Sequence, residues 1–161
     1  MRIYNKSMRI VRKLDMPMVR AEILNSYGVH LFRIERYDLA EKKWLKCRNI
    51  SNQYKLPWIK AIAEMNLSDI YSRKGKFRTA HDLLRRCEKT LKKINDLEGV
   101  SGVYFNRALV YAREGKIDEA YEFFERSEEF PLVYDNKRKE RREVFNDCLR
   151  DKGYSPVRNP I

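Results

Sequence analysis

The sequence has few of the residues on which disulfide frameworks, metal centres and turn-rich folds depend. Its 161 residues include three Cys, two His, six Gly and five Pro. It contains no CxxC pair and no cluster of His and Cys, so neither a structural zinc nor a disulfide framework is expected. The scarcity of Gly and Pro suits a helical protein. We expect no metal and no other cofactor.

Long apolar runs are missing as well. No run approaches the roughly 20 apolar residues that a membrane-spanning helix needs. The opening MRIYNKSMRIVRKLDMP carries charges throughout and lacks the apolar centre of a signal peptide. We therefore predict a cytoplasmic protein without a membrane partner.

Sequence motifs of catalysis are also absent. The sequence has no Gly-rich phosphate loop, no nucleophile elbow and no zinc-binding helix motif. His30 and His81 occupy unrelated positions in the repeat described below, which favours packing or surface roles. We predict that the protein is not an enzyme.

Positive charge is abundant by comparison. The chain has 35 Lys and Arg against 23 Asp and Glu, a net charge of +12. This excess favours an acidic partner, nucleic acid included. Hydrophobic residues make up 43% of the chain, which is enough for a folded core.

The dominant pattern is an internal repeat with a spacing of forty residues. Five columns of similar residues share this spacing: Gly28, Ser68 and Ala108; Leu31, Tyr71 and Tyr111; Ala40, Ala80 and Ala120; Trp44, Leu84 and Phe124; Cys47, Cys87 and Ser127. Self-similarity at a fixed period indicates a repeat architecture in which each unit packs against its neighbours.

Within each repeat the apolar residues recur at three- and four-residue steps, which predicts amphipathic helices. Three helix pairs are expected, over 17–33 and 37–54, 57–73 and 77–95, and 98–113 and 117–129. Gly75 and Gly115 follow the first helix of their pairs, where a left-handed residue ends a helix without strain. Glu35 replaces this glycine in the first pair, so we expect its turn to be built differently.

The pattern resembles the tetratricopeptide repeat, whose signature is W-x2-L-G-x2-Y, then A-x3-F, then P. The matching residues are Leu24, Tyr27, Gly28, Leu31, Ala40 and Trp44; Leu67, Ser68, Tyr71, Ala80 and Leu84; and Tyr104, Ala108, Tyr111, Ala120 and Phe124. Glu64 and Arg107 depart from it, because they stand at bulky apolar positions. The resemblance covers residues 1–132 and implies an all-α, right-handed α-solenoid of antiparallel helix pairs.

The expected division of the chain follows the forty-residue spacing. It comprises a half repeat at 1–15, repeats at 17–55, 57–96 and 97–132, a capping helix at 134–153 and a loose tail at 154–161. Tyr4 lies forty residues before Trp44, so the half repeat matches the second helix of a preceding unit. It is either a cap or a sign that the chain is a piece of a longer protein. Both interpretations leave an apolar edge that favours homodimerisation or a missing domain.

The resemblance implies a concave face lined by first helices, on which side-chain amides hold the backbone of a bound peptide. An Asn suits this role because its amide can donate and accept hydrogen bonds together. The expected groove residues are Asn25, Ser26, Val29, Phe32, Met65, Asn66, Asp69, Phe105, Asn106 and Leu109, with Ile62 beside them. Packing between repeats is the alternative role for the apolar members. The family's clamp for acidic C-terminal peptides is matched only at Asn66, so that specificity is not expected.

Two sets of cations are candidates for anion binding. Arg33, Arg73 and Arg113 lie where first helices end and could hold a carboxylate or phosphate, or could be solvated charges that favour a helix C-terminus. A second set lies on second helices, which would face the convex side: Lys42, Lys43, Lys46, Arg78, Arg85, Arg86, Lys89, Lys92 and Lys93. Nucleic-acid phosphate could bind there, although interspersed Glu residues favour an ordinary solvated face.

The predicted function is a non-catalytic scaffold that binds a peptide or a helix of another protein in the concave groove. One alternative is the regulatory or oligomerisation region of a larger transcriptional regulator or signalling ATPase. Another is RNA binding through the basic convex face.

Overall fold

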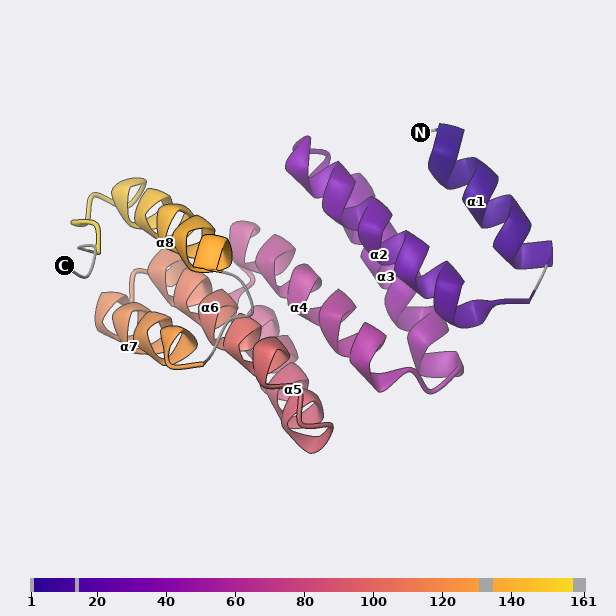
Figure 1. Ribbon diagram of the computed structural model, residues 1–161. Helices are drawn as coiled ribbons and strands as arrows, with labels where there is room; N and C mark the ends of the chain where they lie inside the picture. The colour runs from indigo at the N-terminus through magenta and orange to yellow at the C-terminus, as the bar shows by residue number, and fades with distance from the viewer. Residues whose placement is uncertain (1, 14, 131–134, 158–161) are drawn as a thin grey trace.

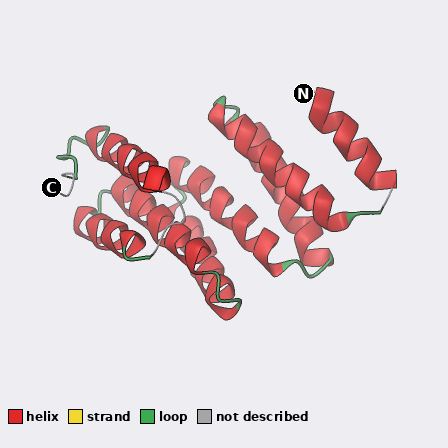
Figure 2. Ribbon diagram, viewed as in Figure 1, coloured by secondary structure: helices red, strands yellow, loops and turns green. Residues whose placement is uncertain are grey.

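The computed structural model describes residues 2–13, 15–130 and 135–157. Its helices are α1 (Arg2–Lys13), α2 (Pro17–Arg33), α3 (Tyr37–Gln53), α4 (Pro57–Arg73), α5 (Phe77–Lys93), α6 (Leu97–Glu114), α7 (Ile117–Glu128) and α8 (Asp135–Arg150). No strand occurs among these residues (Figure 2). The prediction of an all-α protein is confirmed.

The helices stack as pairs in one elongated array (Figure 1). α2 packs on α3, α4 on α5 and α6 on α7, and successive pairs meet through α3 with α4 and α5 with α6. First helices also contact one another, α2 with α4 and α4 with α6, and α6 contacts α8. No comparable contact joins the second helices within the described ranges. Because the inner helices of a curved stack lie closest together, α2, α4, α6 and α8 line the concave face. The predicted solenoid of helix pairs is confirmed.

Small residues allow the two helices of each pair to approach closely. Gly28 on α2 is buried against the indole of Trp44 on α3, and a Cβ at Gly28 would lie only 2.4 Å from Trp44 Nε1. The same indole N–H donates to the carbonyl of Asn25 at 3.2 Å. The later pairs have Leu84 or Phe124 at the position of Trp44, and they tolerate Ser or Ala in place of glycine. Trp44, the largest of these three side chains, is therefore matched by glycine, the smallest residue, on the facing helix.

Each turn from α2 to α7 contains one residue with a left-handed backbone. These residues are Glu35, Lys55, Gly75, Asn95 and Gly115, with φ angles of 60°, 52°, 70°, 57° and 85°. At Glu35 the N–H donates to the Phe32 carbonyl, and the N–H of Arg36 donates to the Leu31 carbonyl. The same two bonds close the turn at Gly75. The expectation that Glu35 changes the turn is therefore wrong: the helix-end hydrogen bonds hold a non-glycine residue in this conformation, against a strain of about 1–2 kcal/mol.

Buried thiols and hydroxyls join the two helices of each repeat. Cys47 and Cys87 each donate from Sγ at 3.2 Å to the backbone carbonyl of the residue 26 positions earlier, on the first helix. In the third pair the direction is reversed, and the Ser101 hydroxyl donates to the Ser127 carbonyl at 2.8 Å. Burial raises the pKa of Cys47 to about 11 and that of Cys87 to about 12. Both thiols therefore stay protonated as packing groups.

The terminal helices stack on the array through aromatic rings. Tyr4 of α1 lies on Tyr27 of α2 with ring centroids 4.3 Å apart and planes 9° apart. Phe145 of α8 lies on Phe124 of α7 at 4.4 Å and 5°. α1 therefore occupies the place of a second helix, and α8 contacts α6 as the next first helix would.

Part of the expected loose tail is attached to the fold. Tyr121 donates its hydroxyl hydrogen to the Ser155 carbonyl at 2.8 Å, and the N–H of Val157 donates to Asn146 Oδ1 at 2.7 Å. Val157 also packs against the apolar core. Residues 154–157 are therefore held against α7 and α8, which corrects the expectation for that segment. Residues 158–161 and the junction at 131–134 lie outside the described residues.

Candidate binding faces

Two of the expected groove amides bond to each other across the concave face. Asn66 on α4 donates from Nδ2 to Asn25 Oδ1 on α2 at 3.0 Å. Both residues are half-buried. This arrangement leaves the Asn25 amide N–H2 group and the Asn66 carbonyl oxygen, one donor and one acceptor, without a hydrogen-bond partner among the described residues. A peptide backbone could use both together.

Asn106 and Ser26, two further polar residues of the expected groove, are less well placed. Asn106 donates to the carbonyl of Gly102 on its own helix at 2.9 Å. Ser26 is exposed beside Asn25. The amides of the three repeats therefore do not form one continuous row, although the sequence aligns them.

The apolar groove residues divide between the surface and the core. Val29 and Phe32 are partly buried at the edge of a core cluster formed by α2 to α5, and Met65 and Phe105 are also only partly buried. Leu109 is only 4% exposed and belongs to the core. The expectation that Leu109 lines the groove is therefore corrected, because its side chain packs between helices.

The rim cations of the second and third repeats are engaged within the protein. Arg113 on α6 pairs with Asp69 on α4 and donates to the Ser72 hydroxyl at 2.6 Å. Arg73 lies 5.1 Å above the Phe32 ring and 3.5 Å from Asp69. Asp69 is therefore a link between α4 and α6, while Arg33 remains exposed.

An apolar pocket opens between α4, α6 and α8, which we call the α4–α6–α8 pocket. It has a volume of about 450 Å³ and is lined by Trp58, Ile62, Met65, Ile94, Asp96, Glu98, Gly99, Gly102 and Arg141. Trp58 and Ile94 are 47% and 41% exposed, so apolar surface borders this pocket. The Trp58 indole is fixed by donating to Asp96 Oδ2 at 2.8 Å.

Sequence reasoning found Ile62 and Met65 but missed Trp58, Ile94 and Arg141. A signal for Arg141 was present, because it follows Ala21, Ala61 and Ser101 at the same forty-residue spacing. The first three are small, and they lie where the second helix of a pair packs. Arg141 takes this place on α8, which has no second helix of its own among the described residues.

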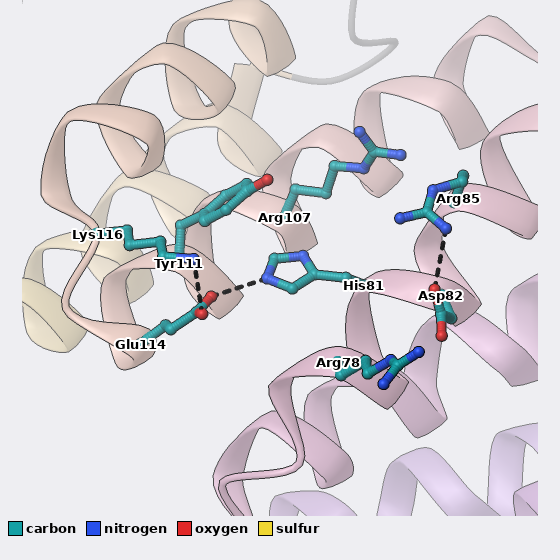
Figure 3. Close-up of a pocket in the computed structure, with 8 residues that line it drawn as sticks. All are labelled: Arg78, His81, Asp82, Arg85, Arg107, Tyr111, Glu114 and Lys116. Carbon is teal, nitrogen blue, oxygen red and sulfur yellow. Dashed lines mark hydrogen bonds and ion pairs between the residues drawn. The ribbon is translucent and has the colours of Figure 1, made fainter.

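A polar pocket lies on the other side of the array, where α5, α6 and the start of α7 meet (Figure 3). Its volume is about 490 Å³, and its lining residues are Arg78, His81, Asp82, Arg85, Arg107, Tyr111, Glu114 and Lys116. Asp82 pairs with Arg85 at 2.9 Å, and Glu114 pairs with Lys116 at 2.8 Å. His81 Nε2 lies 2.9 Å from the other Glu114 oxygen. Most of this charge is compensated inside the pocket.

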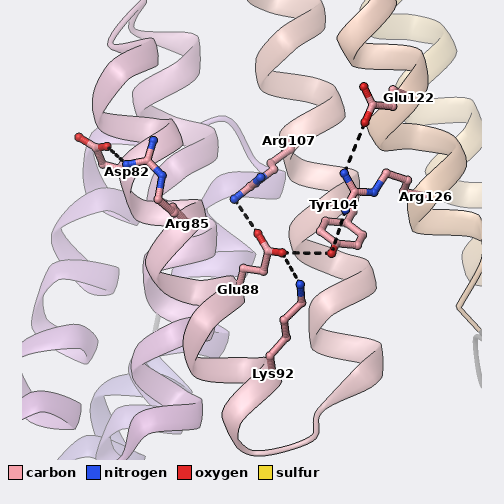
Figure 4. A network of polar contacts seen from close by, with 8 residues as sticks. All are labelled: Asp82, Arg85, Glu88, Lys92, Tyr104, Arg107, Glu122 and Arg126. Atoms are coloured by element: carbon pink, nitrogen blue, oxygen red, sulfur yellow. Dashed lines mark hydrogen bonds and ion pairs between the residues drawn. The ribbon is translucent and has the colours of Figure 1, made fainter.

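A network next to this pocket joins α5 to α6 (Figure 4). The Glu88 carboxylate lies 2.7 Å from both Lys92 Nζ and Arg107 Nη2 and accepts a hydrogen bond from the Tyr104 hydroxyl at 3.1 Å. Arg126 of α7 lies over the Tyr104 ring, with 4.5 Å between its Cζ and the ring centroid. Cations that appear in the sequence as a free basic surface are thus partly used to hold helices together.

Comparison with known proteins identifies the repeat. Two family models, both described as tetratricopeptide repeat, match residues 19–93 and 101–130, together more than half of the chain. The chain belongs to the tetratricopeptide repeat family. A comparison with curated proteins gives no match. Tetratricopeptide repeats are in general protein–protein interaction modules.

The departures from the tetratricopeptide pattern have structural explanations. Arg107, at an apolar position, lays its guanidinium 5.1 Å from the centre of the Phe123 ring while it pairs with Glu88. Glu64 is only 6% exposed and lines a small pocket with Arg48 and Lys60. A charged side chain thus replaces the apolar one where opposite charge lies on the facing helix.

Two kinds of feature are absent from the described residues. No helix among them is both long and apolar enough to cross a bilayer. No group of three or more His, Cys, Asp or Glu residues in the same ranges has a geometry that could hold a metal ion.

Proposed function

We propose that this tetratricopeptide repeat chain is a non-catalytic module that binds a segment of another protein along its concave face. The observation that supports this most strongly is the α4–α6–α8 pocket, an apolar hollow on the same face as the Asn25–Asn66 amide pair. Such a combination of an apolar pocket and a few placed polar groups is typical of ligand sites.

Energetics give the two parts different weights. The free donor and acceptor of the amide pair contribute about 1–3 kcal/mol, at about 0.5–1.5 kcal/mol per net hydrogen bond. A micromolar complex needs about 8 kcal/mol. The remainder has to come from apolar burial, at about 25 cal/mol per Å². The pocket therefore provides affinity, and the amide pair provides backbone register.

Selection of displayed random peptides against the whole chain tests this function. Synthetic versions of the selected peptides would be titrated calorimetrically against the native protein and the double variant Asn25→Ala with Asn66→Ala. We expect the double variant to bind about tenfold more weakly. Asn49→Ala, an exposed amide on α3, is the matched control and should bind normally. If no peptide is selected, or if the native protein and the double variant bind the peptides equally, the concave face is not the binding site.

Self-association through α1 is a second candidate. Ile10 is 47% exposed on α1, on which no further helix is stacked in the described part of the chain. A regulator that oligomerises through its repeats would use such an edge. Analytical ultracentrifugation should then show a dimer that Ile10→Asp abolishes, whereas Ile34→Asp, at an equally exposed Ile in a turn, leaves it intact. A monomer at all concentrations would eliminate this candidate.

The proposed location is the cytoplasm. All three cysteines are free thiols, and Cys47 and Cys87 are buried. Free thiols of this kind suit a reducing compartment.

A further inference from the structure

Arg141 is a cation without a carboxylate partner in a mostly apolar place. Its side chain is half-buried on the inner side of α8, and its only direct hydrogen bond among the described residues runs from Nη1 to the Ser101 hydroxyl, at 2.7 Å. Its Cζ lies 5.4 Å from the centre of the Phe105 ring. Burial lowers the pKa of this guanidinium. A buried charge is stable only when it is paired or well hydrogen-bonded, so Arg141 has unused capacity for an anion.

The charges of Glu98, Glu128 and Glu140 act on Arg141, but none of these carboxylates forms an ion pair with it among the described residues. Glu98 pairs with Lys137, and Glu128 pairs with Arg142. Asp96 accepts hydrogen bonds from the Trp58 indole and from the N–H of Gly99, at 2.8 Å each. Arg141 is left as the group at this end of the pocket that can bind a negative charge from outside.

The apolar wall and the guanidinium border the same small space. A Cβ placed on Gly102 would lie 3.5 Å from Met65 Sδ and 3.7 Å from Arg141 Nη2. A single carbon group there would touch both residues without clashing. A ligand that uses both must therefore carry its apolar group and its negative charge only a few atoms apart.

We propose that the α4–α6–α8 pocket binds an apolar group that carries a carboxylate, with the carboxylate on Arg141 and the apolar group against Met65, Ile62 and Trp58. The planar guanidinium suits a carboxylate, which it can hold through two parallel hydrogen bonds. The last residue of a peptide chain has this chemistry when its side chain is apolar, and so does a small organic acid. A pocket of about 450 Å³ is of the size that holds a small ligand.

This inference extends the proposed function to a named subsite but can be tested without a bound peptide. N-acetyl-L-phenylalanine is the probe, and N-acetyl-L-phenylalaninamide, which lacks the charge, is its control. Binding to the whole chain would be followed by NMR at the amide resonances of Gly99 and Gly102 and at the indole N–H of Trp58. We expect the acid to bind at least about tenfold more tightly than the amide. Acetate and N-acetyl-L-alanine should bind more weakly than the phenylalanine acid.

Two variants and one control locate the binding. Arg141→Met removes the charge but keeps a long side chain, and it should bring the affinity for the acid down to that for the amide. Gly102→Ala fills the space next to Arg141 and should weaken binding of the acid by at least about tenfold. It should also raise or preserve the melting temperature, because alanine stabilises a helix interior relative to glycine. A loss of binding in that variant cannot then be attributed to unfolding. Arg150→Met, at an exposed position of the same helix, is the matched control and should bind the acid normally.

A longer peptide that ends in Phe distinguishes the two sources of the ligand. If it binds at least about tenfold more tightly than the single residue, the ligand is a chain terminus that also contacts the groove; equal affinity points to a small acid. The inference is overturned if the acid does not bind, if acid and amide bind equally, or if Arg141→Met leaves binding unchanged. Peptides selected against the concave face that bind regardless of Arg141 would overturn it while leaving the proposed function intact.

Discussion

Arg107 of α6 and Arg141 of α8 are both half-buried, but they are held in different ways. Arg107 projects from α6 and pairs with Glu88 of α5, in a network that also includes Lys92 and Tyr104 (Figure 4). Arg141 projects from α8 into an apolar pocket, where its partner is the hydroxyl of Ser101. A cation of the first kind holds two helices together. We expect a cation of the second kind to contribute little to the fold and to be available to a ligand.

The largest expected effect comes from breaking a paired cation. Arg113 and Asp69 are 14% and 16% exposed and join α6 to α4. Asp69→Ala leaves Arg113 buried with only the Ser72 hydroxyl, so we expect the free energy of unfolding to fall by about 3 kcal/mol. Urea unfolding followed by circular dichroism measures this. Asp118→Ala, at an exposed carboxylate of α7, is the control. A loss below about 1 kcal/mol would show that pairing does not distinguish these cations.

Glu88→Gln tests the ion pair of Arg107 through the pH dependence of the unfolding free energy. Burial alone would raise the pKa of Glu88, but the Lys92 hydrogen bond, the Arg107 charge and the Tyr104 hydrogen bond together lower it. Because the folded pKa lies below the unfolded one, near 4.3, the carboxylate stabilises the fold above that pH. This stabilisation is lost as the pH falls through the folded pKa.

At neutral pH we therefore expect Glu88→Gln to lower the unfolding free energy by about 2 kcal/mol. Below about pH 4 the difference from the native protein should shrink. Unfolding titrations at several pH values measure both quantities, with Glu122→Gln, at a 62% exposed side chain, as the control. A difference that grows in acid would reverse the sign assigned to this carboxylate.

Arg141→Met should change stability by less than about 1 kcal/mol, in either direction, because no ion pair is broken and the new side chain suits an apolar pocket. The same urea titration applies. A loss as large as that of Asp69→Ala would make Arg141 a structural residue and remove the contrast with Arg107.

The smallest effect is expected on the outer surface of α5. Arg86 and Lys89 are exposed, so Arg86→Glu with Lys89→Glu should alter stability by no more than about 0.5 kcal/mol. Retention on immobilised single-stranded RNA in low salt, compared before and after this reversal, tests the remaining case for nucleic acid. Retention by the native chain that falls steeply as salt is raised, and that is lost in the variant, would favour the RNA-binding alternative.

The forty-residue spacing was sufficient to predict the helices, because every repeat places its small and large residues at the same points of helix contact. Glu35 was misjudged for a related reason: the hydrogen bonds of the turn, and not its residue type, set the backbone there. Leu109 and Val157 were misassigned because their burial depends on neighbouring helices and on a returning chain end.

The candidate pocket was less predictable, since it is formed by side chains from three first helices and one turn. Residue spacing aligned Asn66 and Asn106, but it could not show that Asn66 bonds to Asn25 while Asn106 bonds to its own helix. Direction and partner of a side chain depend on three-dimensional packing. The one sequence signal for the pocket was the replacement of the small residues Ala21, Ala61 and Ser101 by Arg141 at the same spacing.

The hydrogen-bonded thiols make the first two repeats individually observable. Alkylating reagents attack the thiolate, and Cys47 and Cys87 are both protonated and enclosed between the two helices of their own repeat. Modification of either thiol therefore requires local opening of that repeat. Mass spectrometry of the two cysteine peptides during slow alkylation under native conditions would report the opening equilibrium of each repeat separately, in the unmodified natural sequence.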